Sequence, residues 1–246
     1  MKNILQNWRQ FGAIFCLVTV LAIVKAEEIS PEAQEVFDTY IEALGGREIL
    51  ETVESIKITG TMTLEGMGLS GRMVLIQKSP NLFYNEQNVE GIGTTIQAYD
   101  GEICWANDMM QGYRELTGKE AELLLDENDL RTNMLIDSRY ASAEVITEPG
   151  VEGKIVLEAV RKVNKRKEIL YFDSESKLIT EIKSVVDMGE QGSIPMSIAF
   201  EDYVESDGVF MAHKMKIQNP AINIEMTLNS HEVNPEIPAD QFRYKE

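Results

Sequence analysis

Apolar and polar side chains alternate with a period of two residues along most of the chain beyond residue 55. From Ile56 to Leu64, isoleucine, methionine and leucine alternate with lysine and threonine. This pattern predicts β-strands with one packed face and one solvated face. The clearest alternation is in three late segments, whose packed faces hold Ile194, Met196, Ile198, Phe200, Val209, Met211, His213, Met215, Ile217, Ile222, Ile224, Met226 and Leu228. Such one-sided strands are typical of antiparallel sheets.

Two regions have helical rather than strand periodicity. Ser30-Pro31-Glu32 combines an N-cap hydroxyl, a proline at the first helical position and an acid in the first turn, so a helix begins there. The second region, residues 117–136, begins with Thr117 as an N-cap and Glu120 as its capping-box partner. Short turns such as Asp100-Gly101 join the remaining segments and favour neighbouring antiparallel strands. We expect a mainly β (α+β) fold: one large curled antiparallel sheet, with helices 31–53 and 117–136 covering its apolar face.

The first 26 residues have the order of a secretory signal peptide. Lys2 and Arg9 precede an uncharged apolar run, and small residues lead to a cleavage site after Ala26. The run is about 14 residues, whereas a spanning helix needs about 20, so an uncleaved anchor is the alternative. We expect residues 27–246 to form a single exported domain that is periplasmic, or alternatively secreted.

The charge of the chain limits its partners. The formal net charge of −18 becomes −21 when the leader, with its three cations and no acid, is removed. Nucleic acid requires a basic footprint, and anionic lipid surfaces attract cationic segments, so neither is an electrostatic partner of this chain. Cys104 is then the only cysteine, so no internal disulfide forms, and we expect it to be a buried strand residue.

No motif of catalysis or metal binding stands out. His213 and His231 have no metal-ligand spacing with each other or with Cys104; His213 falls on a packed face and His231 near the end of a wet one. The acid cluster 126–129 raises the question of calcium, but lacks the glycine and terminal glutamate of a calcium loop. We therefore predict no catalytic residues, no metal site and no cofactor.

The packed faces are rich in methionine, a flexible side chain that suits surfaces accepting variable apolar shapes. A sheet covered by few helices leaves space for an apolar ligand. We predict a cavity wall for acyl chains made of Met62, Met73, Trp105, Met196, Ile198, Phe200, Met211, Met215 and Met226. The alternative is that these methionines simply fill a core.

The order of several segments resembles the outer-membrane lipoprotein-sorting proteins, which are LolA-like carriers and their many relatives. The matching pieces are 40–46 (YIEALGG), 56–62, 94–105 with its Tyr-Asp-Gly-Glu turn and Trp105, 113–118 (YRELTG), 200–203 (FEDY), 207–209 (DGV) and 233–235 (VNP) with Phe242. Each piece is weakly specific alone, and together they cover nearly all of residues 27–246.

The resemblance implies a LolA/LolB-like incomplete β-barrel, capped by helices and enclosing an apolar cavity. In those carriers the cavity holds the acyl chains of lipoproteins between two membranes. We therefore expect a monomeric periplasmic carrier for lipid or lipoprotein acyl chains, served by a membrane-bound donor or acceptor protein. The alternative is a non-catalytic envelope sensor or scaffold whose cavity is filled by its own side chains, and a third reading is a hydrolase with an acidic pair. Fold alone does not choose among such roles.

Overall fold

A computed structural model describes residues 28–187 and 192–244, so the expected signal peptide at 1–26 lies outside the described residues. The described helices are α1 (Pro31–Ala43), α2 (Arg47–Glu51), α3 (Gly118–Glu127), α4 (Leu130–Met134) and the 3₁₀ turn η1 (Ile136–Arg139). The strands are β1 (Ser55–Glu65), β2 (Leu69–Lys78), β3 (Leu82–Val89), β4 (Gly93–Tyr99), β5 (Cys104–Asp108), β6 (Gly112–Glu115), β7 (Tyr140–Ile146), β8 (Lys154–Arg161), β9 (Lys167–Asp173), β10 (Ile179–Asp187), β11 (Ser193–Ser206), β12 (Val209–Gln218) and β13 (Asn223–Val233). The predicted mainly β composition is confirmed, and the short β6 is a strand that the alternation did not predict.

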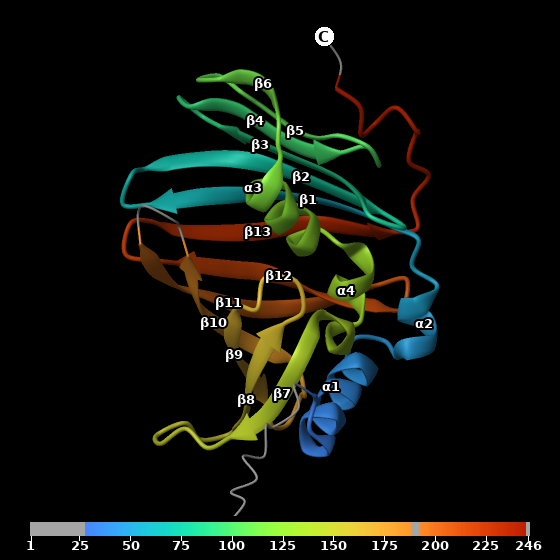
Figure 1. Cartoon of the computed structure of the whole chain (residues 1–246), viewed down its shortest axis with the longest axis vertical. Coiled ribbons are helices and arrows are strands. Elements are labelled where there is room, and N and C mark those ends of the chain that lie inside the picture. Colours follow the sequence, from blue (N-terminus) through green and yellow to red (C-terminus); the bar gives the residue numbers. More distant parts are fainter. Residues whose placement is uncertain (1–27, 188–191, 245–246) are drawn as a thin grey trace, which may run out of the picture.

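All the strands form a single antiparallel sheet in the order β6-β5-β4-β3-β2-β1-β13-β12-β11-β10-β9-β8-β7. Only β1 and β13, which pair with each other, are neighbours far apart in sequence. In the described residues β6 and β7 are the two edges and do not pair, so the sheet curls without closing (Figure 1). The helices lie on the inner side of the curl, which confirms the predicted incomplete barrel with helices over its concave face.

The helix α1 begins and ends as its sequence predicts. Ser30 is the N-cap, and its Oγ accepts a hydrogen bond from the backbone N–H of Ala33 at 3.2 Å. Gly45, with φ of 129°, lets the chain leave the helix, and a Cβ there would lie 2.0 Å from the carbonyl oxygen of Gly208. The apolar face of α1 is buried, and Phe37 stacks on Tyr140 of η1–β7 with ring centroids 5.7 Å apart. The helix thereby closes one end of the curl.

A β-bulge changes the alternation of β13. The register with β1 shifts between Thr59 and Gly60, where Ser230 pairs with Thr59 but Leu228 pairs with Gly60. Asn229 is therefore an extra residue, and positions after it exchange faces. A Cβ on Gly60 would lie 2.6 Å from the Thr227 carbonyl oxygen, so the close approach at this bulge requires glycine.

The carboxyl-terminal segment packs on the outer side of the sheet. Ile237 and Phe242 form a buried cluster with Ile76, against which side chains of β2 and β3 also pack. Ile76 pairs with Lys57, a solvent-side position of β1, which identifies this as the convex face. No helix among residues 28–187 and 192–244 is long and apolar enough to span a membrane.

Candidate functional site

The concave face carries continuous apolar rows that cross neighbouring strands. Directly paired residues in an antiparallel sheet point to the same side, so the register identifies each row. One row crosses from β2 to β9 through Leu69, Leu64, Ile224, Ile217, Ile198, Ile182 and Leu170. The next row crosses from β1 to β11 through Met62, Met226, Met215 and Phe200. The sheet thus presents an apolar surface made from segments far apart in sequence.

The middle of this face is only half-buried. We call it the apolar trough, and its side chains, all of intermediate exposure, are Ile182, Met196, Ile198, Phe200, Met215, Ile217, Ile224 and Met226. By contrast, the end next to α1 and α2 is filled by a core of fully buried residues, including Phe37, Leu50 and Leu157. The trough therefore borders a packed core on one side and is incompletely covered by the side chains of residues 28–187 and 192–244.

Eight of the nine predicted wall residues lie on the concave face. Met196, Ile198, Phe200, Met215 and Met226 are in the trough. Met62 and Met73 are on the same face but buried, each 5% exposed, and Met211 packs against the core as a half-buried residue. The structure thus places these eight residues on one face of the sheet.

Trp105 lies on the other face, and its placement in the cavity wall is corrected. Its cross-strand row runs through Ala98, Tyr84 and Ile76, which is the row of the convex cluster. Its ring is 3% exposed, and its Nε1–H donates to the carbonyl oxygen of Phe242 at 3.0 Å. Alternation in a strand of five residues shows two faces without showing which one is inside, so the sequence could not place it.

The helix α3 bridges the two arms of the curled sheet, of which the first arm is β1 to β6 and the second arm is β7 to β13 (Figure 1). On one side, Leu124 and Leu125 pack against Phe83 and Cys104 on the first arm. On the other side, its last two residues pair with Arg161 at the end of β8 and with Arg166 in the β8–β9 turn. Thr117 is its N-cap as predicted, but the capping-box bond is absent, because Glu120 instead pairs with Arg114 at 2.9 Å.

A compact ionic cluster fixes the end of α3. Its members are Asp126, Glu127, Arg139, Arg161, Arg166 and Glu168. Arg161, whose side chain is 1% exposed, bonds the Asp126 carboxylate and lies 3.7 Å from both Glu127 and Glu168. Arg166 joins Glu127 at 2.6 Å and Glu168 at 2.7 Å. Three cations and three anions balance, as a buried charged cluster requires.

The same cluster accounts for the acids that raised the question of calcium. Burial alone would raise the pKa of Glu127, but Arg139, Arg161 and Arg166 outweigh it and lower that pKa. Asp129 is occupied as the N-cap of α4, where its Oδ1 accepts from the Thr132 N–H at 2.8 Å. Arginine side chains and the cap of α4 engage these carboxylates, and in the described parts of the chain no three His, Cys, Asp or Glu side chains converge on a metal position.

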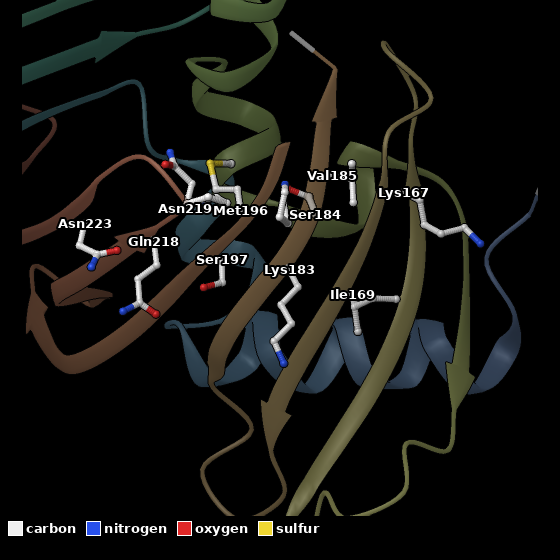
Figure 2. Close-up of a pocket in the computed structure, with 12 residues that line it drawn as sticks. Lys167, Ile169, Lys183, Ser184, Val185, Met196, Ser197, Gln218, Asn219 and Asn223 are labelled. Carbon is white, nitrogen blue, oxygen red and sulfur yellow. The ribbon is translucent and has the colours of Figure 1, made fainter. Parts of the chain in front are cut away.

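Two hollows border these elements. One of about 310 Å³ lies between Leu123 of α3, the β8–β9 turn at Val163 and the end of β10 at Val186. It lies between the first part of α3, residues 119–123, and the second arm of the sheet, next to the ionic cluster that joins them. The other, about 680 Å³ and broadly open, lies on the outer side of β9–β12, where Lys183, Ile169 and Ser197 share the solvent face (Figure 2). In Figure 2 the helix α1 lies beyond these strands, so this second hollow opens mainly on the side away from α1, although Met196 of the trough also lines it.

The sequence interpretation missed a pair of histidines. His231 was expected on a wet face, but the bulge at Asn229 turns it inward, where it is 5% exposed and pairs with Ile58. There His213 Nε2 and His231 Nδ1 are 2.8 Å apart. A bulge leaves no clear mark in one sequence, so the convergence could not be predicted.

Three solved structures share this architecture. A DUF1329-family protein of Desulfovibrio piger ATCC 29098 aligns with a TM-score of 0.59 at 12% identity, over 86% of this chain and 97% of the other. A LolA-superfamily protein of Nitrosomonas europaea gives 0.57 at 9% identity, over 86% and 97%. A domain described as an outer membrane lipoprotein-sorting protein domain, from Vibrio parahaemolyticus, gives 0.53 at 10% identity, over 84% and 97%.

These likenesses define the class of the protein by its architecture. The chain has the LolA-like fold, an unclosed antiparallel half-barrel with helices on its concave side. No protein-family model and no curated protein matches the sequence. At 9–12% identity the likeness shows the fold alone, so function must be argued from the site.

Proposed function

We propose that this protein is a non-catalytic carrier of the cell envelope, exported to the periplasm, that holds acyl chains of a lipid or lipoprotein against its concave face. The observation that supports this most strongly is the apolar trough, in which Met196, Met215 and Met226 stay half-buried beside a complete core. Each acyl methylene that leaves water for such a surface gains about 0.8 kcal/mol. Methionine flexibility lets one surface accept chains of different length and shape.

The helix α3 is the cover in this proposal. It contacts the first arm through apolar packing and the second arm through the ionic cluster. The 310 Å³ hollow lies between α3 and the second arm, beside that cluster. A chain entering the trough would displace α3 from one arm while the other contact holds it. Release then requires a partner that binds the same acyl chains more tightly, such as a membrane-bound acceptor protein.

Uptake of a fluorescent long-chain fatty acid tests the proposal. Met226→Glu and Met196→Glu each place a carboxylate in the trough, where an unpaired charge is costly, so both should abolish uptake. Thr227→Glu is the matched control, because Thr227 is the neighbouring exposed residue on the solvent side of the same strand. Uptake that survives both trough substitutions would show that the acyl site is elsewhere.

The second candidate is an envelope sensor or scaffold. The filled end of the curl favours it, since Phe37, Leu50 and Phe172 already occupy the space between helices and sheet. Mass spectrometry of lipids extracted from protein purified from its own cells separates the two. A stoichiometric lipid supports the carrier, whereas repeatedly empty extracts together with no fatty-acid uptake support the scaffold.

A further inference from the structure

His213 and His231 are the two histidines of the chain, and they meet on the concave face between β12 and β13. Their rings are T-shaped, with centroids 5.0 Å apart and planes at 81°. His231 is buried and His213 is half-buried. The contact is made by ring nitrogens, His213 Nε2 and His231 Nδ1, which are 2.8 Å apart. Two nitrogens therefore converge from neighbouring strands onto one point.

A backbone carbonyl determines which ring nitrogens of this pair carry a hydrogen. His231 Nε2 lies 3.2 Å from the carbonyl oxygen of Val209, which can only accept, so Nε2 carries the hydrogen. His231 Nδ1 then keeps its lone pair, and His213 Nε2 donates to it. A hydrogen bond from one ring nitrogen to a backbone carbonyl, as His231 Nε2 makes here, is the arrangement that orients a histidine to bind a metal through its other ring nitrogen.

We propose that the pair is a binding site for a soft monovalent metal ion, with Cu(I) as the chemical type, held by His213 Nε2 and His231 Nδ1 and by a thioether of Met211 or Met215. Two metal–nitrogen bonds of about 2.0 Å at a tetrahedral angle place the nitrogens about 3.3 Å apart. When His213 binds the metal through Nε2, the hydrogen of that nitrogen moves to Nδ1 of the same ring, and the observed separation of 2.8 Å then needs to widen by only about half an ångström.

The surroundings select the type of metal. Met211 and Met215 flank His213 at alternate positions of β12, each about 7 Å away along the strand and on the same face. Both side chains pack against the core that lies on this face of the sheet. Thioether and imidazole ligands suit Cu(I), whereas calcium and magnesium need oxygen ligands.

Nitrogen NMR of the ¹⁵N-histidine-labelled protein tests the site directly, with Ag(I) as a redox-inert probe of the same ligand preference. The chain has only two histidines, so all four ring-nitrogen signals can be assigned. We expect one equivalent of Ag(I) to shift and split the signals of His213 Nε2 and His231 Nδ1, and to leave His231 Nε2 protonated. Unchanged signals at one equivalent, or coupling at the other nitrogens, would overturn the proposal without any variant.

Competition with a chromogenic Cu(I) chelator measures the Cu(I) affinity of the protein, and comparison of variants shows how much each proposed ligand contributes to it. His213→Asn should weaken Cu(I) binding beyond the roughly 10–100-fold that loss of an outer partner costs, and Met211→Leu with Met215→Leu should weaken it about tenfold or more. Met109→Leu with Met110→Leu is the control for exposed sulfur, because these side chains are 76% and 95% exposed. Binding that persists in His213→Asn, falls in the Met109 and Met110 control, or prefers Zn(II) over Cu(I) would contradict the proposed site.

Discussion

Arg161 is among the largest fully buried side chains in the described residues, and its guanidinium lies among three carboxylates. Nothing around it in the sequence marks it as different from the exposed lysines nearby. Its burial depends on Asp126 and Glu127, more than thirty residues earlier, and on Glu168, which also accepts from the Tyr140 hydroxyl at 2.6 Å. At the scale of the residue, distant partners thus decide whether a charge belongs to the surface or to the interior.

Replacing this arginine should be among the most destabilising single changes in the chain. Arg161→Ala leaves Asp126 and Glu168 buried without their cation, so we expect the free energy of unfolding to fall by about 3–5 kcal/mol. Urea denaturation measures the loss. Lys57→Ala, which removes an exposed pair with Glu232, is the control and should cost about 1 kcal/mol or less. A loss near that of the control would show that the cluster contributes little.

Cys104 should be unreactive in the folded protein. Burial, with a smaller contribution from Glu120, raises the pKa of its thiol to about 11. At pH 8 the thiolate is then about 200-fold rarer than in an unfolded chain with a pKa of about 8.5, and labelling by a disulfide reagent should slow at least in proportion. The folded state holds the Cys104 proton more tightly than the unfolded state does. The contribution of this thiol to the free energy of unfolding is therefore complete below pH 8.5 and declines as the pH rises toward 11. Equal labelling rates in native buffer and in denaturant would contradict this.

At the scale of the element, β13 shows how one residue changes a face. Before Asn229 its apolar residues follow the predicted alternation, and after it His231 and Val233 point inward instead. Side-chain period in a strand is two, so one inserted residue exchanges every later position. This insertion is what creates the histidine pair.

Deleting Asn229 should therefore be far more harmful than replacing it. The deletion moves His231 and Val233 to the solvent face and brings exposed neighbours inside, so we expect a loss of at least about 3 kcal/mol in unfolding free energy. Asn229→Ala, at an exposed position, should change it by less than about 0.5 kcal/mol. Chemical denaturation of both variants checks this, and a well-folded deletion variant would mean that the bulge relocates along β13.

At the scale of the whole molecule, the unclosed sheet makes the concave face available. A closed small barrel fills its interior with its own side chains, whereas this curl ends at β6 and β7 and relies on α3 to join the arms. The fold therefore leaves an apolar surface beside a cover that is attached by different chemistry at each side.

Binding of an acyl ligand should then stabilise the entire protein. At about 100 times its dissociation constant, a long-chain fatty acid adds about 2.7 kcal/mol, which corresponds to a rise of about 5–10 °C in Tm for a domain of this size. Differential scanning calorimetry measures the shift, with a four-carbon acid as the control that should leave Tm unchanged. The Met226→Glu variant should lose the shift, and an equal shift in that variant would place the ligand outside the trough.

Much of this structure follows from local pattern. The cap at Ser30, the glycine ending of α1 and the alternation of β11 and β12 are properties of neighbouring residues, and each appears where it was predicted. Trp105 and His231 show where local pattern stops. A strand of five residues does not reveal which face is covered, and a bulge depends on the strand beside it rather than on its own sequence.

The sequence by itself determined the strand-rich composition, the places of most elements and the methionine-rich apolar faces, because side-chain alternation and caps act over a few residues. Only the tertiary structure decided which face is concave, that Arg161 is buried among acids, and that His213 meets His231. These features depend on the register between strands far apart in the chain, such as β1 with β13, and register is set by packing of the whole sheet.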